Sequence, residues 1–399
     1  MDTIQSTSKL SVEKLIAAAF AETGLNDFGA FDPREGMTRF VQDINDNVLL
    51  NDAGLASLSA IINRWLVNGL RFAHDIKKHP EILDEQVDDP LVILGMTRVG
   101  STKLQRLLAA DPDTLCIRHW ESLNPSRVPD APADEEDPRI EMDRQIIDAM
   151  IKNNLGLMQS HSVKIDDAEE DIFVQLPTFK TVGHCWVLPT PNYYDWIRSQ
   201  SLHDSYVYLK QMLQYLQWQK GGRPSANGDR RWILKTPPHI GNMDMLVDIF
   251  PNAKYVFMHR DIHEVIASTA RLIEMLFRTC MDVVDKKMVG AYVLRLWSEE
   301  MTRHLEQLDA LGSKIDLIDV QYDRLRKDTF GVVRDIYQLM GRELTPAREA
   351  ALRDWEANDT HGEFGSYTYS LEEYGLTPAG VDAAFAEYNR RYFPVQPAR

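Results

Sequence analysis

The stretch from Leu91 to Leu108, LVILGMTRVGSTKLQRLL, has residue types and a spacing that could bind an anion. A short apolar strand leads into a Gly-x4-Gly turn at residues 95–100, and an amphipathic helix follows. In this arrangement the backbone N–H groups at the helix start face a phosphate. A nucleotide kinase would need lysine where this chain has Ser101, and positive charge comes instead from Arg98 and Lys103. The loop therefore predicts an anion site whose ligand is not the β,γ-phosphates of ATP.

A second group of polar residues follows two later strand-like runs. Lys235 comes after the first run and Arg260 after the second, and Ser268 lies eight positions beyond Arg260 on the helix that should follow. Arginine and serine can both make charge-assisted hydrogen bonds to a phosphate. Together with the loop at 95–102, these residues could bind a cofactor that has two separated phosphate groups.

The elements that must position these residues alternate between strand and helix patterns. Apolar strand-like runs occur at Leu91–Leu94, Trp232–Leu234, Tyr255–Met258 and Ile315–Tyr322. The alternation predicts an α/β fold with a parallel sheet flanked by helices. Ligands of such sheets bind at the carboxyl ends of the strands. The segments GMTRVGST, KTPPH, HRD and QYDRL all fall at those ends.

The chain before the first strand has a helical pattern. Two apolar faces are expected, one of Val12, Leu15, Ile16, Ala19 and Phe20 and one of Leu58, Ile61, Ile62, Trp65 and Leu66. Ser11 is the expected N-cap of the first helix, and Gly24 lies just past its end. We divide the chain into a helical segment, 1–88, that packs on an α/β domain, 89–399. The acidic, proline-rich stretch at 128–143 is expected to be an exposed connection.

Composition narrows the possible partners. A net charge of −16 argues against a nucleic acid or an anionic membrane as the partner. No run of about 18 apolar residues suggests a transmembrane helix, and the first residues do not resemble a signal peptide, so a cytoplasmic location is expected. The three cysteines suggest neither a disulfide framework nor a metal site. The sequence leaves a homo-oligomer open.

The motifs, in their order and spacing, resemble those of sulfotransferases. The loop resembles their 5′-phosphosulfate loop, KTPPH their Lys-Thr strand end, and HRDIHEVIAS their 3′-phosphate motif. The resemblance to bacterial sulfotransferases extends from FGAFDPREGM to YSLEEYGLTPAGVDAAFAEYNRRY. It implies the cofactor 3′-phosphoadenosine 5′-phosphosulfate, whose product is adenosine 3′,5′-bisphosphate.

The resemblance also implies roles for individual residues. The family pattern Pro-Arg/Lys-Ser-Gly-Thr-Thr stands here as TRVGST at 97–102. Arg98 would contact the 5′-phosphosulfate and stabilise charge on the leaving oxygen, with Lys235 as a second catalytic cation. Arg260 and Ser268 would hold the 3′-phosphate. Further cofactor contacts are expected from Val99, Gly100, Ser101, Thr102 and Lys103.

This chain departs from the family pattern at three places. Val99 lacks a hydroxyl that relatives usually have, and Thr97 replaces a proline that would stiffen the turn. Relatives also carry a basic, glycine-containing stretch near the C-terminus that covers the 3′-phosphate. The corresponding Ala357–Ser370 contains no lysine or arginine, which leaves open what covers the 3′-phosphate here.

Two residues are candidates for the general base, and Glu121 is the first choice. Glu121, in RHWES, follows Arg98 by 23 positions, similar to a glutamate in several sulfotransferases. A cap or ion-pair carboxylate is the structural alternative for this glutamate. His239 is the rival because cytosolic sulfotransferases place a histidine directly after Lys-Thr, although Pro237 and Pro238 intervene here. No histidine and carboxylate spacing suggests a metal ligand set.

These features together predict a metal-independent sulfotransferase. The expected reaction is in-line transfer of the sulfuryl group to a hydroxyl, in preference to an amine, of a small-molecule acceptor. Aromatic residues are enriched at 173–218, where either an acceptor pocket or an aromatic core would account for them. The alternatives are a catalytically silent nucleotide-binding protein and a P-loop kinase.

Overall fold

A parallel sheet lies at the centre of the molecule. The computed structural model describes residues 9–129, 131, 135–153, 163–225, 228–359 and 370–394. Within this part of the chain the main sheet has the strand order β2-β5-β1-β6-β7. Its strands are β1 Leu91–Leu94, β2 Thr114–Leu115, β5 Arg231–Lys235, β6 Lys254–His259 and β7 Asp316–Gln321. A separate antiparallel pair consists of β3 Pro224–Ser225 and β4 Gly228–Asp229.

The sheet confirms the predicted fold class. Every residue of β1 is buried, as expected for a strand covered by helices on both faces. β1 pairs in parallel with β5 on one side and with β6 on the other, and β7 pairs in parallel with β6. All four predicted strands are present, and their carboxyl ends therefore meet at one edge. The sequence did not reveal β2, which has only two residues.

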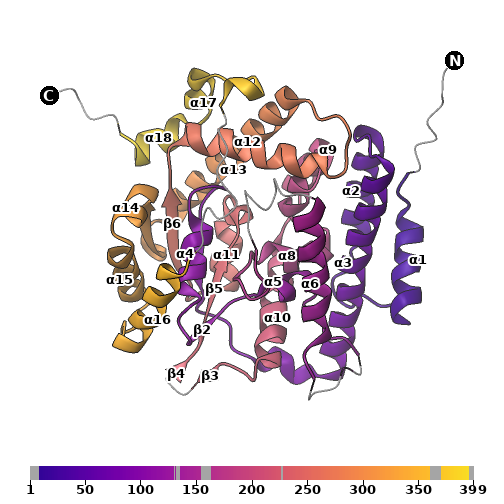
Figure 1. Ribbon diagram of the computed structural model, residues 1–399, viewed down its shortest axis with the longest axis horizontal. Helices are drawn as coiled ribbons and strands as arrows, with labels where there is room; N and C mark the ends of the chain where they lie inside the picture. Colours follow the sequence, from indigo (N-terminus) through magenta and orange to yellow (C-terminus); the bar gives the residue numbers. More distant parts are fainter. Residues whose placement is uncertain are drawn as a thin grey trace.

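Helices cover both faces of the sheet (Figure 1). Those before β5 are α1 Val12–Thr23, α2 Arg34–Asn47, α3 Asp52–Lys78, α4 Ser101–Leu108, α5 His119–Leu123, α6 Pro138–Asn153, α8 Ile172–Gln175, α9 Pro191–Arg198 and α10 His203–Gln219. Those after β5 are α11 Met243–Ile249, α12 Ile262–Arg278, α13 Lys286–Leu311, α14 Tyr322–Lys327, α15 Thr329–Leu339, α16 Pro346–Ala357, α17 Pro378–Ala384 and α18 Ala386–Tyr392. In Figure 1, α1 to α3 form one flank of the molecule and α14 to α16 the opposite flank. None of the described helices is long and apolar enough to cross a membrane.

The N-terminal helices share a hydrophobic core with the sheet. The α1 helix begins after Ser11, whose hydroxyl accepts a hydrogen bond from the Lys14 N–H, and it ends at Gly24 in the left-handed conformation, as the sequence predicts. One continuous cluster of buried side chains includes Phe40 of α2 and Trp65 of α3 together with the strands. Apolar packing therefore crosses residue 88, the boundary at which we divided the chain.

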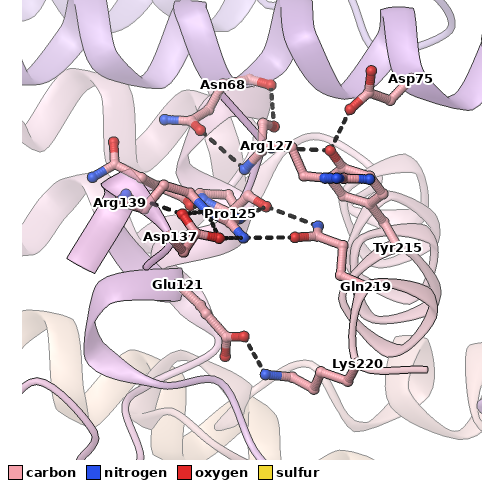
Figure 2. Close-up of polar contacts among 12 residues, drawn as sticks. Asn68, Asp75, Glu121, Pro125, Arg127, Asp137, Arg139, Tyr215, Gln219 and Lys220 are labelled. Carbon is pink, nitrogen blue, oxygen red and sulfur yellow. Dashed lines mark hydrogen bonds and ion pairs between the residues drawn. The ribbon is translucent and has the colours of Figure 1, made fainter. Parts of the chain in front are cut away.

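The second half of the acidic stretch at 128–143 is not the exposed connection that we expected. Its residues from Pro138 onward form the start of α6, and Arg139 and Asp143 are buried. The guanidinium group of Arg139 donates hydrogen bonds to Asp137 and to the side chain of Gln219 on α10 (Figure 2). These buried polar contacts hold the first turns of α6 against the molecule.

Candidate active site

The phosphate loop joins β1 to α4 and has an unusual backbone. Arg98 has a φ of 68° and Gly100, the N-cap of α4, has a φ of 89°, so both lie in the left-handed region. Side chains other than glycine rarely adopt this conformation, and strained residues of this kind concentrate at functional sites. A Cβ atom on Gly100 would lie 2.7 Å from Cδ2 of Tyr322, so the ring also requires glycine there.

Residues predicted to bind the two phosphate groups meet beside this loop. Arg98 Nε donates to Ser268 Oγ over 3.1 Å, and Arg260 Nη1 donates to the carbonyl oxygen of Arg98 over 2.8 Å. The hydroxyl groups of Thr97 and Thr269 are 2.5 Å apart. The loop, the end of β6 and helix α12 are thus joined through side chains. The structure brings Arg98, Arg260 and Ser268 together, as the sequence analysis expects.

The side chains of two other residues that were predicted to contact the cofactor, Lys103 and Val99, make contacts within the protein instead. Lys103 pairs with Glu356 at 3.5 Å, on the side of α4 that faces α16. The side chain of Val99 is fully buried and packs against Gly95. Because this side chain points into the core, replacing a hydroxyl with an isopropyl group at position 99 removes no donor from the ligand side.

Lys235 is buried at the end of β5, beside the first turn of α4. Its ammonium group lies 2.7 Å from Glu170 Oε1 and donates to Thr102 Oγ1 over 3.2 Å. The hydroxyl of Thr236 donates to the second oxygen of Glu170 over 3.1 Å. A buried ammonium group needs a nearby carboxylate, which explains the position of Glu170. The Glu170 side chain keeps 20% of its surface exposed, whereas that of Lys235 keeps 1%.

Sequence reasoning missed Glu170 as a site residue. It lies in the run Glu169-Glu170-Asp171, which reads as a solvated helix start. Its partner Lys235 is 65 positions away. No local spacing indicates this pairing, and only the folded chain brings the carboxylate to the loop.

His239 does not face an open site. The ring is fully buried in the short helix that begins at Pro237, and its Nδ1 is 3.0 Å from the hydroxyl of Tyr206. Nε2 is 2.9 Å from Asp171 Oδ2, an ion-pair distance, although the two groups are not aligned for a hydrogen bond. Asp171 Oδ1 also accepts a hydrogen bond from the backbone N–H of Lys235. This buried placement between Tyr206 and Asp171 argues against His239 as the general base.

Glu121 is held by two structural contacts. One oxygen accepts a hydrogen bond from the backbone N–H of Arg118 at the start of α5, over 2.8 Å. The other oxygen forms an ion pair with Lys220, which follows α10 (Figure 2). Only 3% of the side chain is exposed. The cap and ion-pair alternative describes this carboxylate better than the role of base that we favoured.

The aromatic residues at 173–218 mainly build the core. Six of the ten are buried: Phe179, Tyr193, Tyr194, Tyr206, Tyr208 and Tyr215. These six side chains account for most of the aromatic enrichment as core packing. A cavity of about 390 Å³ does adjoin this region, with Phe31, Thr178 and Ser205 in its wall. Another of about 760 Å³ lies at the opposite edge of the sheet, where Arg231 and Lys254 begin β5 and β6.

Two further expectations concern the C-terminal stretch and metals. Residues 360–369, most of the stretch that we compared with the basic clasp of relatives, lie outside the described residues. Among the described residues, no group of three or more histidine, cysteine, aspartate or glutamate side chains could hold a metal ion.

The parallel sheet carries a glycine-containing loop and two arginines, Arg98 and Arg260, at its carboxyl edge, an arrangement suited to binding an anionic group. A sequence model of the sulfotransferase family matches residues 90–346, and the chain belongs to this family. The protein is therefore a sulfotransferase enzyme.

Solved structures of mycobacterial sulfotransferases have the same fold. Sulfotransferase STF9 from Mycobacterium avium has a TM-score of 0.83 and 28% identity, and the match covers 100% of both chains. Sulfotransferase STF1 from Mycobacterium tuberculosis H37Rv has a TM-score of 0.82 and 26% identity, over 96% of this chain and 100% of that one.

A third similar protein has an acceptor in its name. The omega-hydroxy-beta-dihydromenaquinone-9 sulfotransferase Stf3 of Mycobacterium tuberculosis is 23% identical over 318 residues. The match covers 76% of this chain and 75% of that protein. The protein of the same name from Mycobacterium bovis matches equally well.

Proposed function

We propose that the protein transfers the sulfuryl group of 3′-phosphoadenosine 5′-phosphosulfate to a hydroxyl group of a small molecule. The observation that carries this proposal is the meeting of Arg98, Ser268 and Arg260 at one loop, although they come from three separate elements. Guanidinium and hydroxyl groups are donors suited to phosphate and sulfate oxygens.

The donor set fits a ligand with two anionic ends. The N–H groups at the start of α4 and the side chain of Arg98 would hold the 5′-phosphosulfate, and the N-terminus of a helix adds a favourable dipole. Arg260 and Ser268 would hold the 3′-phosphate. When bound, the cofactor supplies the sulfuryl group. Arg98 and Lys235 would stabilise the charge that develops on the leaving oxygen.

Glu170 is our proposed proton acceptor in place of Glu121. Its side chain is partly exposed and lies beside the loop. Contacts with Lys235 and Thr236 fix the orientation of its carboxylate. A base must lie within hydrogen-bond reach of the acceptor hydroxyl, and its own position must be fixed. The fully buried His239 and the capped Glu121 meet these requirements less well.

The acceptor class follows from the similar proteins. The name of Stf3 specifies an acceptor with a hydroxyl at the end of a long apolar chain. At 23% identity we take from this the functional group and the apolar character, not the compound. Alcohols with long apolar chains should therefore be included with phenols and sterols in a substrate screen that uses labelled cofactor.

Ligand-induced stabilisation tests the proposed cofactor. Adenosine 3′,5′-bisphosphate should raise the melting temperature without Mg²⁺, because a ligand that binds only the native state stabilises it. ATP with Mg²⁺ should have little effect, since Ser101 stands where a nucleotide kinase has lysine. A larger shift with ATP and Mg²⁺ than with the bisphosphate would contradict the proposal and favour the kinase alternative.

A further inference from the structure

Carboxylates pair with three of the four cations that the sequence predicts around the loop, and the fourth, Arg98, donates to Ser268 and is assigned to the 5′-phosphosulfate. The pairs are Lys235 with Glu170 at 2.7 Å, Arg260 with Glu264 at 2.6 Å and Lys103 with Glu356 at 3.5 Å. Each pair has a net charge near zero, so it attracts a phosphate much less than a lone cation would. A cofactor with a doubly charged 3′-phosphate therefore needs positive charge from another residue.

Arg260 illustrates this lack of net positive charge most clearly. Its Nε and Nη2 both donate to one oxygen of Glu264, and its Nη1 donates to the carbonyl oxygen of Arg98. All three nitrogen atoms of the guanidinium group thus have protein partners. A 3′-phosphate that approaches Arg260 also approaches the Glu264 carboxylate, which repels it.

Arg326 and Arg260 both lie near the ring of Tyr322. Arg326 lies on α14, one helical turn after Tyr322, and its guanidinium carbon is 5.8 Å from the centre of that ring. The guanidinium carbon of Arg260 is 4.4 Å from the same ring centre, and the ring edge packs against Gly100 of the loop. Arg326 is exposed and pairs with no carboxylate in the described part of the chain.

We propose that Arg326 is the second cation that binds the 3′-phosphate. It thereby takes the place of the basic C-terminal stretch, whose counterpart here has no lysine or arginine. This inference rests on the proposed function, because it assumes a cofactor with a 3′-phosphate. The planar guanidinium group can bind a phosphate through two parallel hydrogen bonds, while the phenol ring of Tyr322 keeps both arginines at the loop.

The test compares two nucleotides by calorimetry, without acceptor or turnover. Arg326→Ala should weaken binding of adenosine 3′,5′-bisphosphate about tenfold, the loss expected for one charge-assisted contact at an exposed site. Binding of adenosine 5′-monophosphate, which has no 3′-phosphate, should change less than about twofold. The difference should shrink as the salt concentration rises, because salt screens exposed charges.

Arg324→Ala is the matched control. Arg324 is an exposed arginine on the same helix, but it pairs with Asp335 at 2.5 Å. Its loss should leave the affinity for both nucleotides unchanged. Unaltered bisphosphate affinity in Arg326→Ala, or an equal loss for the two nucleotides, would overturn the inference. If the wild-type protein bound no bisphosphate at all, the proposed cofactor would be wrong, and the inference would fall with it.

Discussion

Glu170 and Glu121 are both carboxylates paired with a lysine, but their accessibility differs. Glu170 contacts Lys235 and Thr236 through its two oxygens and keeps a fifth of its side chain exposed, 20%. The Glu121 side chain is 3% exposed, and its two oxygens contact Lys220 and the backbone N–H of Arg118. A proton acceptor needs contact with the acceptor molecule, and this difference in exposure is the reason for proposing Glu170.

Glu170→Gln should lower kcat by about 10²–10⁴-fold, the usual contribution of a general base, with little change in bisphosphate affinity. Glutamine keeps the shape and removes the basicity. In Glu121→Gln, the loss of a buried charge partner for Lys220 should lower the melting temperature while kcat of the folded enzyme stays near normal. Steady-state kinetics and thermal melts on both variants check this. If kcat fell in Glu121→Gln and stayed near normal in Glu170→Gln, Glu121 would be the base instead.

At the scale of elements, the loop and α4 form a unit whose shape depends on Gly100. The residue has a φ of 89° and a ψ of 6°, and Tyr322 occupies the space next to it. Gly24 provides a natural comparison, because it has a φ of 69° and a ψ of 5°, and a Cβ atom there would have no neighbour within 4 Å.

Gly100→Ala should therefore damage the site, whereas Gly24→Ala should cost only stability. Alanine in the left-handed conformation costs about 1–2 kcal/mol at either position. Only at position 100 must Tyr322 or the loop also move, and bisphosphate affinity should fall at least tenfold there. Calorimetry on the two variants measures the difference. Equal affinities would show that the loop tolerates the added methyl group.

How much the sequence could predict also differs between elements. The central strands were predictable because a parallel strand covered on both faces is a continuous apolar run, as in Leu91–Leu94. The candidate anion-binding residues followed from their positions around strand ends and from the motifs that resemble the family. Arg139 and Asp143 were not predictable as buried, since each has a partner on another element, Gln219 and His119. The same reason hid the pairing of Glu170 with Lys235, which lies 65 residues later.

At the scale of the whole molecule, the core encloses histidines that have little or no polar contact. His184 is fully buried among Phe40, Trp65 and Phe179, and neither of its ring nitrogens has a partner in the described structure. Burial lowers the pKa of His184 to about 3, and that of His304 also to about 3. Both rings are neutral in the folded protein at neutral pH.

The free energy of unfolding should consequently fall as the pH decreases below about 6.5. Below that pH these histidines become protonated in the unfolded chain but stay neutral in the folded chain. Each such histidine contributes a slope approaching about 1.4 kcal/mol per pH unit between that pH and about 3. His184→Phe, which suits the aromatic surroundings, should reduce the slope by one histidine's contribution. Denaturant unfolding between pH 7 and pH 5 measures it. An unchanged slope would mean that His184 is protonated in the folded state.

The contact between Gly36 of α2 and Phe179 limits which residue position 36 can hold. Any Cβ atom at position 36 would overlap the carbonyl oxygen of Phe179, whose own φ of 50° is unusual for a phenylalanine. Position 36 lies outside the segment 90–346 that the family model matches. Phe179 lies inside that segment, so this backbone contact joins the N-terminal helical layer to the matched domain. Only glycine fits at position 36 while Phe179 keeps its place.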